Sequence, residues 1–520
     1  MKHAHEIDWK EKPAEPAPVD VDANPFADVI EAHGEPFIVN PKGKPVSFNP
    51  MFAPAVYASR NKVIYDGLLR TFHEYEPLAG LWMPTTPDTM RKKLSDLIFE
   101  LGAELEQPNI AAKEQSHSKL EGTAKNLCAL TDGRFDDRPS GFVHCLNGML
   151  DVCTGELHPF SPEFKSRNAT PFSWDEDASC PRFFDELLAP ALDADDIATI
   201  QLYAGMSLMG RNLAQRILLL TGTPGGGKSQ LCIAIEGLIG RANCTQLRTE
   251  MLAERFELAR LVGKTLLTGK DVPGHFLMTR GAHVLKALSG GDALTTEIKQ
   301  RMGGDTIDGE FSIIVTSNSR LRVQLDGDTG AWRRRLLIVN YERPKPEKPI
   351  PDFARQLLEQ EGVGILRWAV DGARRLLELA YAFPVTPAQQ SRVDSLLDES
   401  NALRSFVGTT IETAPGDNLT TAEIVEAFFA FCDEKQWAVG SVRDVEKELP
   451  DVMMEIHRSA KSSSIERRGK TAKGFRGVKM AENTPNGTVG TGEPNPILRK
   501  NESNIYMDFE TTVPSVPPAL

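Results

Sequence analysis

Eight residues in the middle of this 520-residue chain could hold a polyphosphate. Residues 222–229 fit the pattern G-x-x-x-x-G-K-[ST], the P-loop, in which a glycine-rich turn presents backbone N–H groups to phosphate oxygens. In this pattern Lys228 would reach the β- and γ-phosphates, and the Ser229 hydroxyl would bind Mg²⁺. The residues expected to contact the nucleotide are Gly222, Thr223, Pro224, Gly225, Gly226, Gly227, Lys228, Ser229 and Gln230.

The neighbouring residues predict the strand and the helix that such a loop needs. Residues 217–220 form a short apolar run, which is typical of a buried strand, and residues 231–238 favour a helix. A strand, a glycine-rich turn and a helix N-terminus aim N–H groups and the positive end of the helix dipole at one point. The sequence therefore predicts that the chain binds and hydrolyses ATP, with Mg²⁺ as cofactor.

Hydrolysis also needs an acid at the end of a neighbouring strand, to hold Mg²⁺ and polarise the attacking water. Residues 264–271 resemble a weakly apolar strand that ends at Asp271. We expect this carboxylate to bind the metal and act in catalysis, since no other strand end is seen to supply an acid; the alternative is a turn aspartate. A paired second acid is missing from the segment, so either Asp271 serves both roles or another acid assists it.

Two further groups of polar residues adjoin predicted strands. Residues 311–318 form a strand that ends at Asn318, whose amide could bind the γ-phosphate or the attacking water, or could belong to an ordinary turn. Three consecutive arginines, 333–335, precede the strand 336–339. An arginine here could reach the γ-phosphate of a neighbouring subunit and offset the charge of the transition state. The residues alone leave the choice among the three open, and a solvated basic turn is the alternative.

Composition limits the classes of protein and partner. The net charge of −13 means that any DNA contact must come from a local basic patch or a ring-shaped channel. The seven cysteines include no C-x-x-C pair, which argues against zinc fingers and disulfides and favours the cytosol of a bacterium or a host cell. There is no run of 18 apolar residues and no apolar signal core, so we expect no membrane association.

A basic segment near the C-terminus is the strongest candidate for such a patch. Residues 420–437 and 442–449 predict two helices, and residues 458–479 then carry eight basic side chains and one acidic one, a local charge of +7. Two helices followed by a basic hairpin suggest a winged-helix domain, whose wing would contact the DNA backbone. A solvated charge run is the alternative. The expected DNA-binding residues are Arg467, Arg468, Lys470 and Lys473.

The order of these segments resembles the superfamily 3 helicase module of phage, plasmid and poxvirus-type primase–helicases. Residues 147–156 are similar to the hairpin that precedes the ATPase in this family, and residues 203–210 to the helix that leads into the P-loop. Residues 286–292 are similar to a motif that ordinary P-loop proteins lack. The resemblance places Asn318 at the sensor 1 position and makes Arg335 the best match to the arginine finger, with Arg334 next.

The resemblance implies an α/β fold with an AAA+-like P-loop ATPase core, a mixed α/β N-terminal domain and a C-terminal winged-helix domain. The expected divisions are a disordered tail at 1–34, a helicase-associated domain at 35–190, the ATPase core at 191–345, a helical lid or linker at 346–385, the winged-helix domain at 386–480 and a second disordered tail at 481–520.

The resemblance further implies a ring-forming DNA helicase, a hexamer that acts on single-stranded or forked DNA in replication. ATP would bind between subunits, and a hairpin at 297–304 would offer Lys299 and Arg301 to one strand. We expect the helicase part alone, without a primase domain, so a separate primase or polymerase would make primers. The alternatives are an ATP-switched DNA-binding initiator or regulator without processive unwinding, and an ATPase ring that does not act on DNA.

Overall fold

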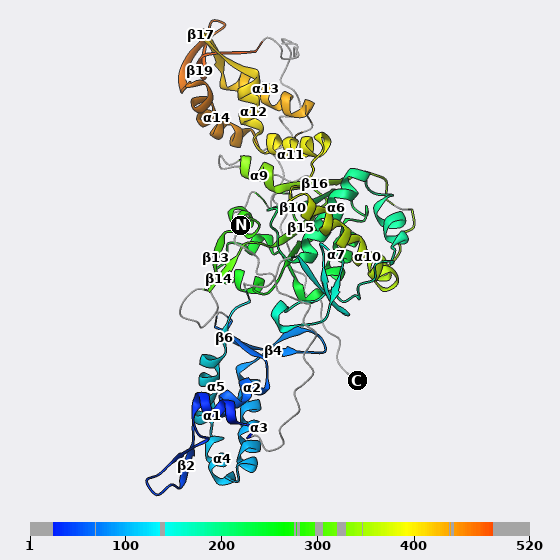
Figure 1. Cartoon of the computed structure of the whole chain (residues 1–520). Helices are drawn as coiled ribbons and strands as arrows, with labels where there is room; N and C mark the ends of the chain where they lie inside the picture. The colour runs from blue at the N-terminus through cyan, green and yellow to red at the C-terminus, as the bar shows by residue number, and fades with distance from the viewer. Residues whose placement is uncertain are drawn as a thin grey trace, which may run out of the picture. The chain divides into compact units, whose positions relative to one another are not determined.

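The structure, a computed structural model, describes residues 24–67, 69–135, 141–274, 277, 281–296, 305–319, 329–345, 347–435, 437 and 441–481. They form two compact units, which divide between Ser400 and Asn401 (Figure 1). Among these residues, no helix is both long enough and apolar enough to cross a bilayer.

A five-stranded parallel sheet forms the centre of the first unit. Its strands, in spatial order, are β11 (Cys244–Gln246), β12 (Leu266–Gly269), β15 (Ser312–Ser317), β10 (Ile217–Gly222) and β16 (Leu336–Tyr341). Every neighbouring pair is parallel, so all five carboxyl ends lie at one edge of the sheet. In α/β sheets, ligands bind at this edge.

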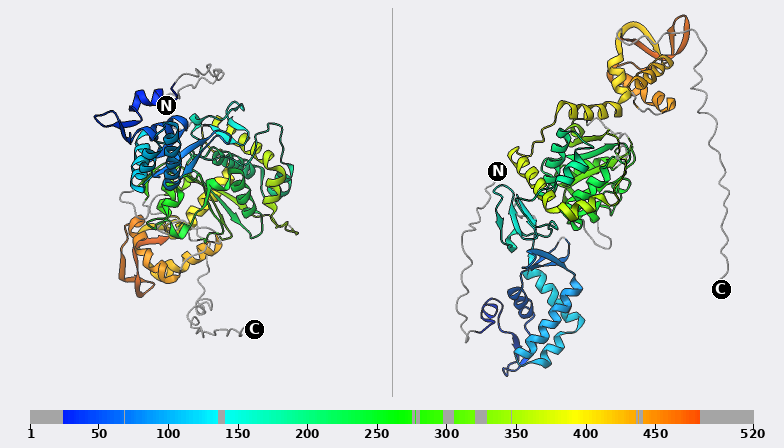
Figure 2. Two further views of the ribbon diagram at one scale, coloured as in Figure 1. Left: turned by 90° about the horizontal axis from the view of Figure 1, so that it is seen from below. Right: turned by 90° about the vertical axis from the view of Figure 1, so that its right-hand side faces the viewer.

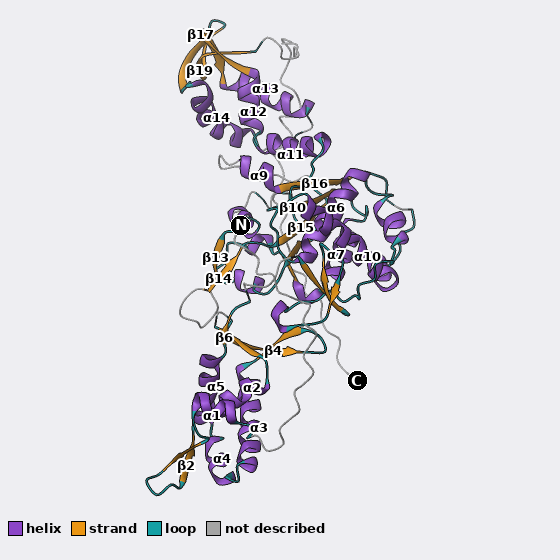
Figure 3. Ribbon diagram, viewed as in Figure 1, coloured by secondary structure: helices purple, strands orange, loops and turns teal. Residues whose placement is uncertain are grey.

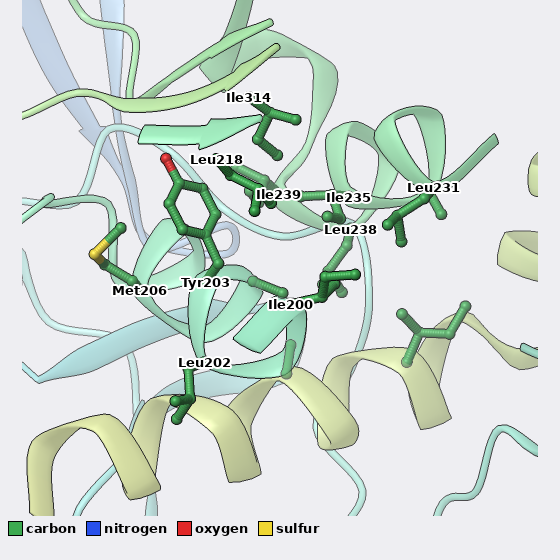
Figure 4. Close-up of a cluster of buried hydrophobic side chains, with 14 of the residues drawn as sticks. Ile200, Leu202, Tyr203, Met206, Leu218, Leu231, Ile235, Leu238, Ile239 and Ile314 are labelled. Atoms are coloured by element: carbon green, nitrogen blue, oxygen red, sulfur yellow. The ribbon is translucent and has the colours of Figure 1, made fainter. Parts of the chain in front are cut away.

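One face of the sheet is covered by three helices that pack on one another, α6 (Ala194–Met209), α7 (Lys228–Ile239) and α10 (Phe353–Glu378) (Figure 3). Leu218 of β10 points into this core together with Tyr203 of α6 (Figure 4). The Tyr203 hydroxyl donates a hydrogen bond to the Ile313 carbonyl (2.7 Å) and accepts one from the Ile313 N–H (2.8 Å). The central strands are therefore anchored to α6.

The opposite face of the sheet packs against α8 (Ala282–Leu288), α9 (Thr329–Arg335) and α11 (Pro387–Ser400). The sequence assigns residues from 386 onward to the C-terminal domain, but α11 belongs to the first unit. The physical reason is its apolar stripe, because Val393, Leu396 and Leu397 are buried in the same core as β10 and β15. Beside α8, β13 (Ala293–Thr296) and β14 (Asp305–Asp308) pair as antiparallel strands.

The N-terminal part of the first unit combines small sheets with helices, which gather in a bundle (Figure 2, blue). Its buried side chains include Phe52, Phe72, Met90 and Leu101. The elements are α1 (Ala27–His33), β1 (Phe37–Val39), β2 (Pro45–Phe48), α2 (Phe52–Arg60), β3 (Val63–Asp66), β4 (Thr71–Glu76), β5 (Leu81–Thr85), α3 (Pro87–Glu104), α4 (Pro108–Glu114), α5 (His117–Leu130) and β6 (Asp132–Gly133).

A three-stranded antiparallel sheet leads from this bundle toward the central sheet. It consists of β7 (Phe142–Cys145), β8 (Gly148–Asp151) and β9 (Leu157–His158), with Cys145 paired to Gly148. Its buried side chains join the core formed by α6, α7 and α10. The short helical turns of the unit are η1 (Pro162–Phe164), η2 (Phe183–Leu188), η3 (Arg241–Asn243), η4 (Thr249–Met251) and η5 (Leu258–Leu261).

The second unit contains α12 (Ala402–Thr410), β17 (Ile411–Thr420), α13 (Thr421–Glu434), α14 (Val442–His457), β18 (Lys461–Arg467) and β19 (Lys470–Met480). The strands form one antiparallel sheet in the order β17-β19-β18. Phe406, Phe428 and Phe475 form its core with other apolar side chains. Helix, strand, two helices and a final hairpin are compatible with a winged-helix domain, which stays a prediction.

Candidate functional site

The glycine-rich loop connects β10 to α7, as its sequence predicts. Gly222 has a φ of 124°, and a Cβ atom there would lie 2.3 Å from the Tyr341 carbonyl oxygen. That carbonyl accepts a hydrogen bond from the Thr223 N–H (3.1 Å), so the loop is fastened to the end of β16. Gly225 and Gly227 also have left-handed backbones, with φ values of 82° and 102°. Glycine is the residue that adopts such conformations without strain.

Helix α7 begins at Lys228, which places Ser229 and Gln230 in its first turn. The first N–H groups of a helix have no partner within it, and Gly227 supplies no side-chain cap. These N–H groups and the helix dipole form an anion-binding arrangement. The Gln230 side chain is directed elsewhere, because its Oε1 accepts a hydrogen bond from the Ala354 N–H (2.8 Å) at the start of α10. Only the backbone of Gln230 is therefore placed to contact a nucleotide.

The Lys228 side chain is buried, with 4% of the residue exposed. Its Nζ donates hydrogen bonds to the carbonyl oxygens of Gly222 (2.9 Å) and Thr223 (2.8 Å). Burial lowers the pKa of Lys228, and the negative charge of Asp271 acts in the opposite direction. The ammonium group is thus held inside the loop, with the predicted catalytic acid close enough to influence it.

Asp271 follows β12 in a left-handed conformation, with a φ of 51°. Its N–H donates to the Thr316 Oγ1 of β15 (3.0 Å), and the Val272 N–H donates to the Thr316 carbonyl oxygen (3.0 Å). Asn318, which follows β15, donates from Nδ2 to Asp271 Oδ1 (3.1 Å). Two predicted site residues from different strands are therefore in direct contact, and Lys228 lies near them.

The three arginines lie at the end of a helix, α9, and not in a turn. Arg335 is on the same face as the buried Ala331 and Trp332, and only 7% of it is exposed. Its Nη1 donates to the Ala331 carbonyl oxygen (3.3 Å), and its Nη2 lies 2.9 Å from where a Cβ atom of Gly290 would be. In this structure Arg335 therefore faces the interior, although the resemblance makes it the best match to the finger.

The two preceding arginines are exposed. The Nε of Arg333 is 2.8 Å from Asp394 Oδ1 of α11. Arg334 lies on the exposed face of α9. Of the two candidates, Arg334 is the one that a second subunit could contact without rearrangement.

Sequence reasoning missed an acid at this edge of the sheet. The statement that no other strand end supplies one is wrong, because β16 continues to Tyr341 and Glu342 follows it directly. Asn340 Nδ2 donates to Glu342 Oε1 (2.8 Å), and Thr221 Oγ1 donates to Asn340 Oδ1 (2.8 Å). A weak signal is present in the sequence, since Tyr341, a residue type that favours strands, comes two residues after the apolar run 336–339.

A second missed residue is Glu236, which lies in α7 two turns after Lys228. Its carboxylate accepts hydrogen bonds from Thr268 Oγ1 of β12 and from Lys270 Nζ (2.7 Å). These contacts connect α7 to the strand that leads to Asp271. They support the position of the acid and do not contact the loop.

The side chains at the loop suit a magnesium ion that is coordinated partly by the protein and partly by the phosphates of a nucleotide. Within the part of the chain that the structure describes, no cluster of three or more His, Cys, Asp or Glu side chains could hold a metal. Mg²⁺ commonly takes one or two protein ligands and completes its shell with phosphate oxygens and water. Ser229 in the first turn of α7 and Asp271 match that pattern.

The predicted DNA-binding residues fall into two groups. Lys299 and Arg301 lie outside the described residues, although β13 and β14 on either side of them pair as a hairpin would, with Thr296 opposite Asp305. The others lie on the β18–β19 hairpin. Arg467 Nε is 3.2 Å from Glu423 Oε1 of α13, so this side chain is engaged in an ion pair. Of the predicted residues on this hairpin, Arg468, Lys470 and Lys473 are exposed.

Comparison with known proteins matches two segments of the chain to families. Residues 57–192 match the family described as D5 N terminal like, and this match supports the broad resemblance to phage-type primase–helicases. Residues 220–335 match a family of unknown function, DUF5906. This second segment includes the loop, Asp271, Asn318 and all three arginines.

Two solved structures are similar to most of the chain at a low level. They are the apo structure of the NrS-1 C terminal region (305-718), with 11% sequence identity, and the A form apo structure of the same region, with 12%. Both have a TM-score of 0.45 and cover 82% of this chain, which corresponds to 98% and 99% of theirs. A likeness of this degree does not define a function.

Proposed function

We propose that this protein is an ATP- and Mg²⁺-dependent DNA helicase that assembles into a ring, a hexamer, for replication of a phage, plasmid or integrated mobile element. One observation carries the proposal: Lys228, Asp271 and Asn318 come together after the ends of three adjacent parallel strands. A glycine-rich loop alone suits phosphate binding. A lysine, a carboxylate and an amide around the same point suit transfer of the γ-phosphoryl group.

The loop from Gly222 to Gly227 and the first turn of α7 hold the β- and γ-phosphates through backbone N–H groups. Lys228 leaves the carbonyl groups of Gly222 and Thr223 to contact the phosphates. Ser229 and Asp271 hold Mg²⁺, which supplies a positive charge for the leaving and transferring oxygens. Asn318, already hydrogen-bonded to Asp271, orients the γ-phosphate or the attacking water.

A second subunit completes this site with an arginine. We assign the role to Arg334, since it is exposed on α9 while Arg335 is buried at Gly290. Positive charge delivered to the γ-phosphate stabilises the transition state. Because the arginine and the loop belong to different protomers, hydrolysis would depend on assembly.

DNA is the partner that fits the D5 N terminal like match and the distribution of charge. Around a ring, repeated Lys299 and Arg301 would offset the acidic balance of the whole chain. The exposed side chains Arg468, Lys470 and Lys473 of the β18–β19 hairpin would contact backbone phosphates. Primer synthesis would belong to a separate primase or polymerase, in the cytosol of a bacterium or a host cell.

The test is strand displacement on a forked DNA duplex with ATP and Mg²⁺, with the Lys228→Ala variant as control. The proposal expects displacement by the natural protein and none by the variant. A protein that binds the fork and hydrolyses ATP but leaves the duplex intact is a switch or initiator. An ATPase rate that DNA does not change would point to a ring that acts on another substrate.

A further inference from the structure

We infer that Glu342 is the second carboxylate of the ATP site, the group that takes the proton of the attacking water. The inference rests on the proposed function and adds a residue to it. Asp271 has Asn318 on one oxygen and Lys228 nearby, which suits the metal. The water-activating role then needs another acid on the same edge of the sheet.

The backbone places Glu342 beside the nucleotide loop. Strand β16 pairs with β10 in parallel register, with Asn340 opposite Thr221 and Tyr341 opposite Gly222. The chain is held on both sides of Glu342. Tyr341 is buried and its carbonyl accepts from the Thr223 N–H, while Arg343 Nη1 donates to the Ala189 carbonyl oxygen (2.7 Å).

The Glu342 carboxylate is also oriented by hydrogen bonds. Thr221 Oγ1, one residue before the loop, donates to Asn340 Oδ1 (2.8 Å), and Asn340 Nδ2 donates to Glu342 Oε1 (2.8 Å). This chain of contacts fixes the Asn340 amide with its NH₂ group toward Glu342. One carboxylate oxygen is thereby held, and the other is left to accept a hydrogen bond from water.

The carboxylate faces a pocket of about 450 Å³ that reaches the loop. On the strand side it is lined by Thr221, Gly222, Asn318, Asn340 and Glu342. Helix α11 forms the other wall and contributes Ser391, Arg392 and Ser395. Since a water molecule occupies about 30 Å³ in the liquid, the pocket has room for a terminal phosphate and several waters.

The charges around the pocket favour Glu342 for this role. Arg392 Nη1 is bound to both carboxylate oxygens of Asp196, at 2.7 Å and 2.8 Å, so its positive charge is offset. Among the described residues that line the pocket, Glu342 carries the one carboxylate. A base there and the amide of Asn318, on the same strand side of the pocket, would bind water between them.

In the proposed step the water oxygen forms a bond to the γ-phosphorus of ATP, and the bond between that phosphorus and the bridging oxygen of ADP breaks. The electron pair of the broken bond stays on ADP. Glu342 takes one proton from the water, and this proton then passes to solvent. Positioned general bases contribute about 10²- to 10⁴-fold to rates.

The experiment measures single-turnover ATP hydrolysis and the affinity for a fluorescent ATP analogue in the full-length protein. In Glu342→Gln we expect hydrolysis to fall about 100-fold or more, with the affinity changed by less than about threefold. Glu342→Asp should recover part of the rate, because it keeps a carboxylate. Glu347→Gln is the matched control, since it neutralises another exposed acid on the same segment. Thermal unfolding checks that each variant is folded.

A normal hydrolysis rate in Glu342→Gln would overturn the inference, in either of two cases. In the first case the affinity for the ATP analogue is also normal, and in the second case it is lost. In the second case the carboxylate would contact the ribose or base and not the water. Failure of the proposed function has a different signature. Hydrolysis that survives Lys228→Ala would remove the loop from the reaction, whatever Glu342 does.

Discussion

Arg334 and Arg335 are adjacent in sequence, and the structure separates their expected roles. Arg334 is exposed on α9, so Arg334→Ala removes few contacts within the protomer. Surface substitutions of this kind usually change the free energy of unfolding by less than about 0.5 kcal/mol. If Arg334 acts on the γ-phosphate of a neighbour, the same change removes transition-state stabilisation. Arginine fingers contribute about 10³- to 10⁵-fold, or at least about 4 kcal/mol.

Arg335→Ala should have the opposite profile. The side chain is 7% exposed, its Nη1 bonds to the Ala331 carbonyl oxygen, and its Nη2 packs at Gly290. Truncating it leaves a cavity and removes a hydrogen bond to a buried carbonyl, which costs about 1–3 kcal/mol of unfolding free energy. ATP hydrolysis per folded molecule should fall much less than in Arg334→Ala.

The assay combines thermal unfolding with ATPase measurements on mixed assemblies. Arg334→Ala and Asp271→Ala are each expected to be inactive alone and to regain activity when mixed, because some interfaces then pair an intact arginine with an intact acid. The reasoning is refuted if Arg335→Ala abolishes hydrolysis without loss of stability while Arg334→Ala remains active. Arg335 would then be the finger, reached through a rearrangement of α9.

Other predictions address the loop, the N-terminal part and the second unit. Lys228→Ala should abolish ATP hydrolysis and retain the native circular dichroism spectrum; turnover in this variant would exclude the P-loop mechanism. Burial and the charge of Arg167 lower the pKa of His73 to about 4, from an ordinary value of about 6.5. Between pH 6.5 and pH 4, His73 is therefore protonated in the unfolded chain and neutral in the folded protein. The free energy of unfolding falls as the pH drops below 6.5 and levels off below 4. Urea unfolding should show a loss of about 2 kcal/mol between pH 7 and pH 5, which His73→Gln removes; an equal loss in the variant would contradict this. Replacing Arg468, Lys470 and Lys473 with alanine should reduce the slope of the logarithm of DNA affinity against the logarithm of salt concentration, by the amount that about two to three phosphate contacts contribute. An unchanged slope would rule out contact by the hairpin.

The local elements of the ATP site could be predicted from the sequence because their signals are local. Residues 217–220 form a continuous apolar run, and β10 is buried on both faces as such a run requires. The glycines at 222, 225 and 227 adopt the positive φ values that only glycine favours. Asp271 and Asn318 were found as polar residues at strand ends. Their contact follows from β15 lying next to β12, which no spacing in the sequence reveals.

The features that the sequence does not predict are set by which face of a helix or strand packs against the core. The sequence predicts an arginine available to a neighbouring subunit and does not show which of the three it is. A helix of seven residues turns Arg335 inward and leaves Arg334 outside. The apolar run predicts a strand that ends at 339, so it does not indicate Glu342. The parallel register with β10 pairs Tyr341 with Gly222 and thereby brings Glu342 to the loop. The division between units was misplaced for the same kind of reason, since the apolar stripe of α11 fits the sheet.

The positions of the basic side chains are compatible with the proposal that the ATP site is shared between subunits. Lys228 is buried in the loop. Arg392 is the arginine among the described residues that line the pocket, and its charge is offset by Asp196. Lys345 is a second lysine beside the loop, since its Cδ lies 3.6 Å from where a Cβ atom of Gly225 would be. In the proposed site, one protomer would therefore offer two lysines and a metal to the phosphates of ATP. Arg343 beside Glu342 is likewise paired, with Asp193. In the proposed site an arginine of another copy would add to this charge, and Arg334 is suited to supply it because it is exposed on α9, the helix that precedes β16.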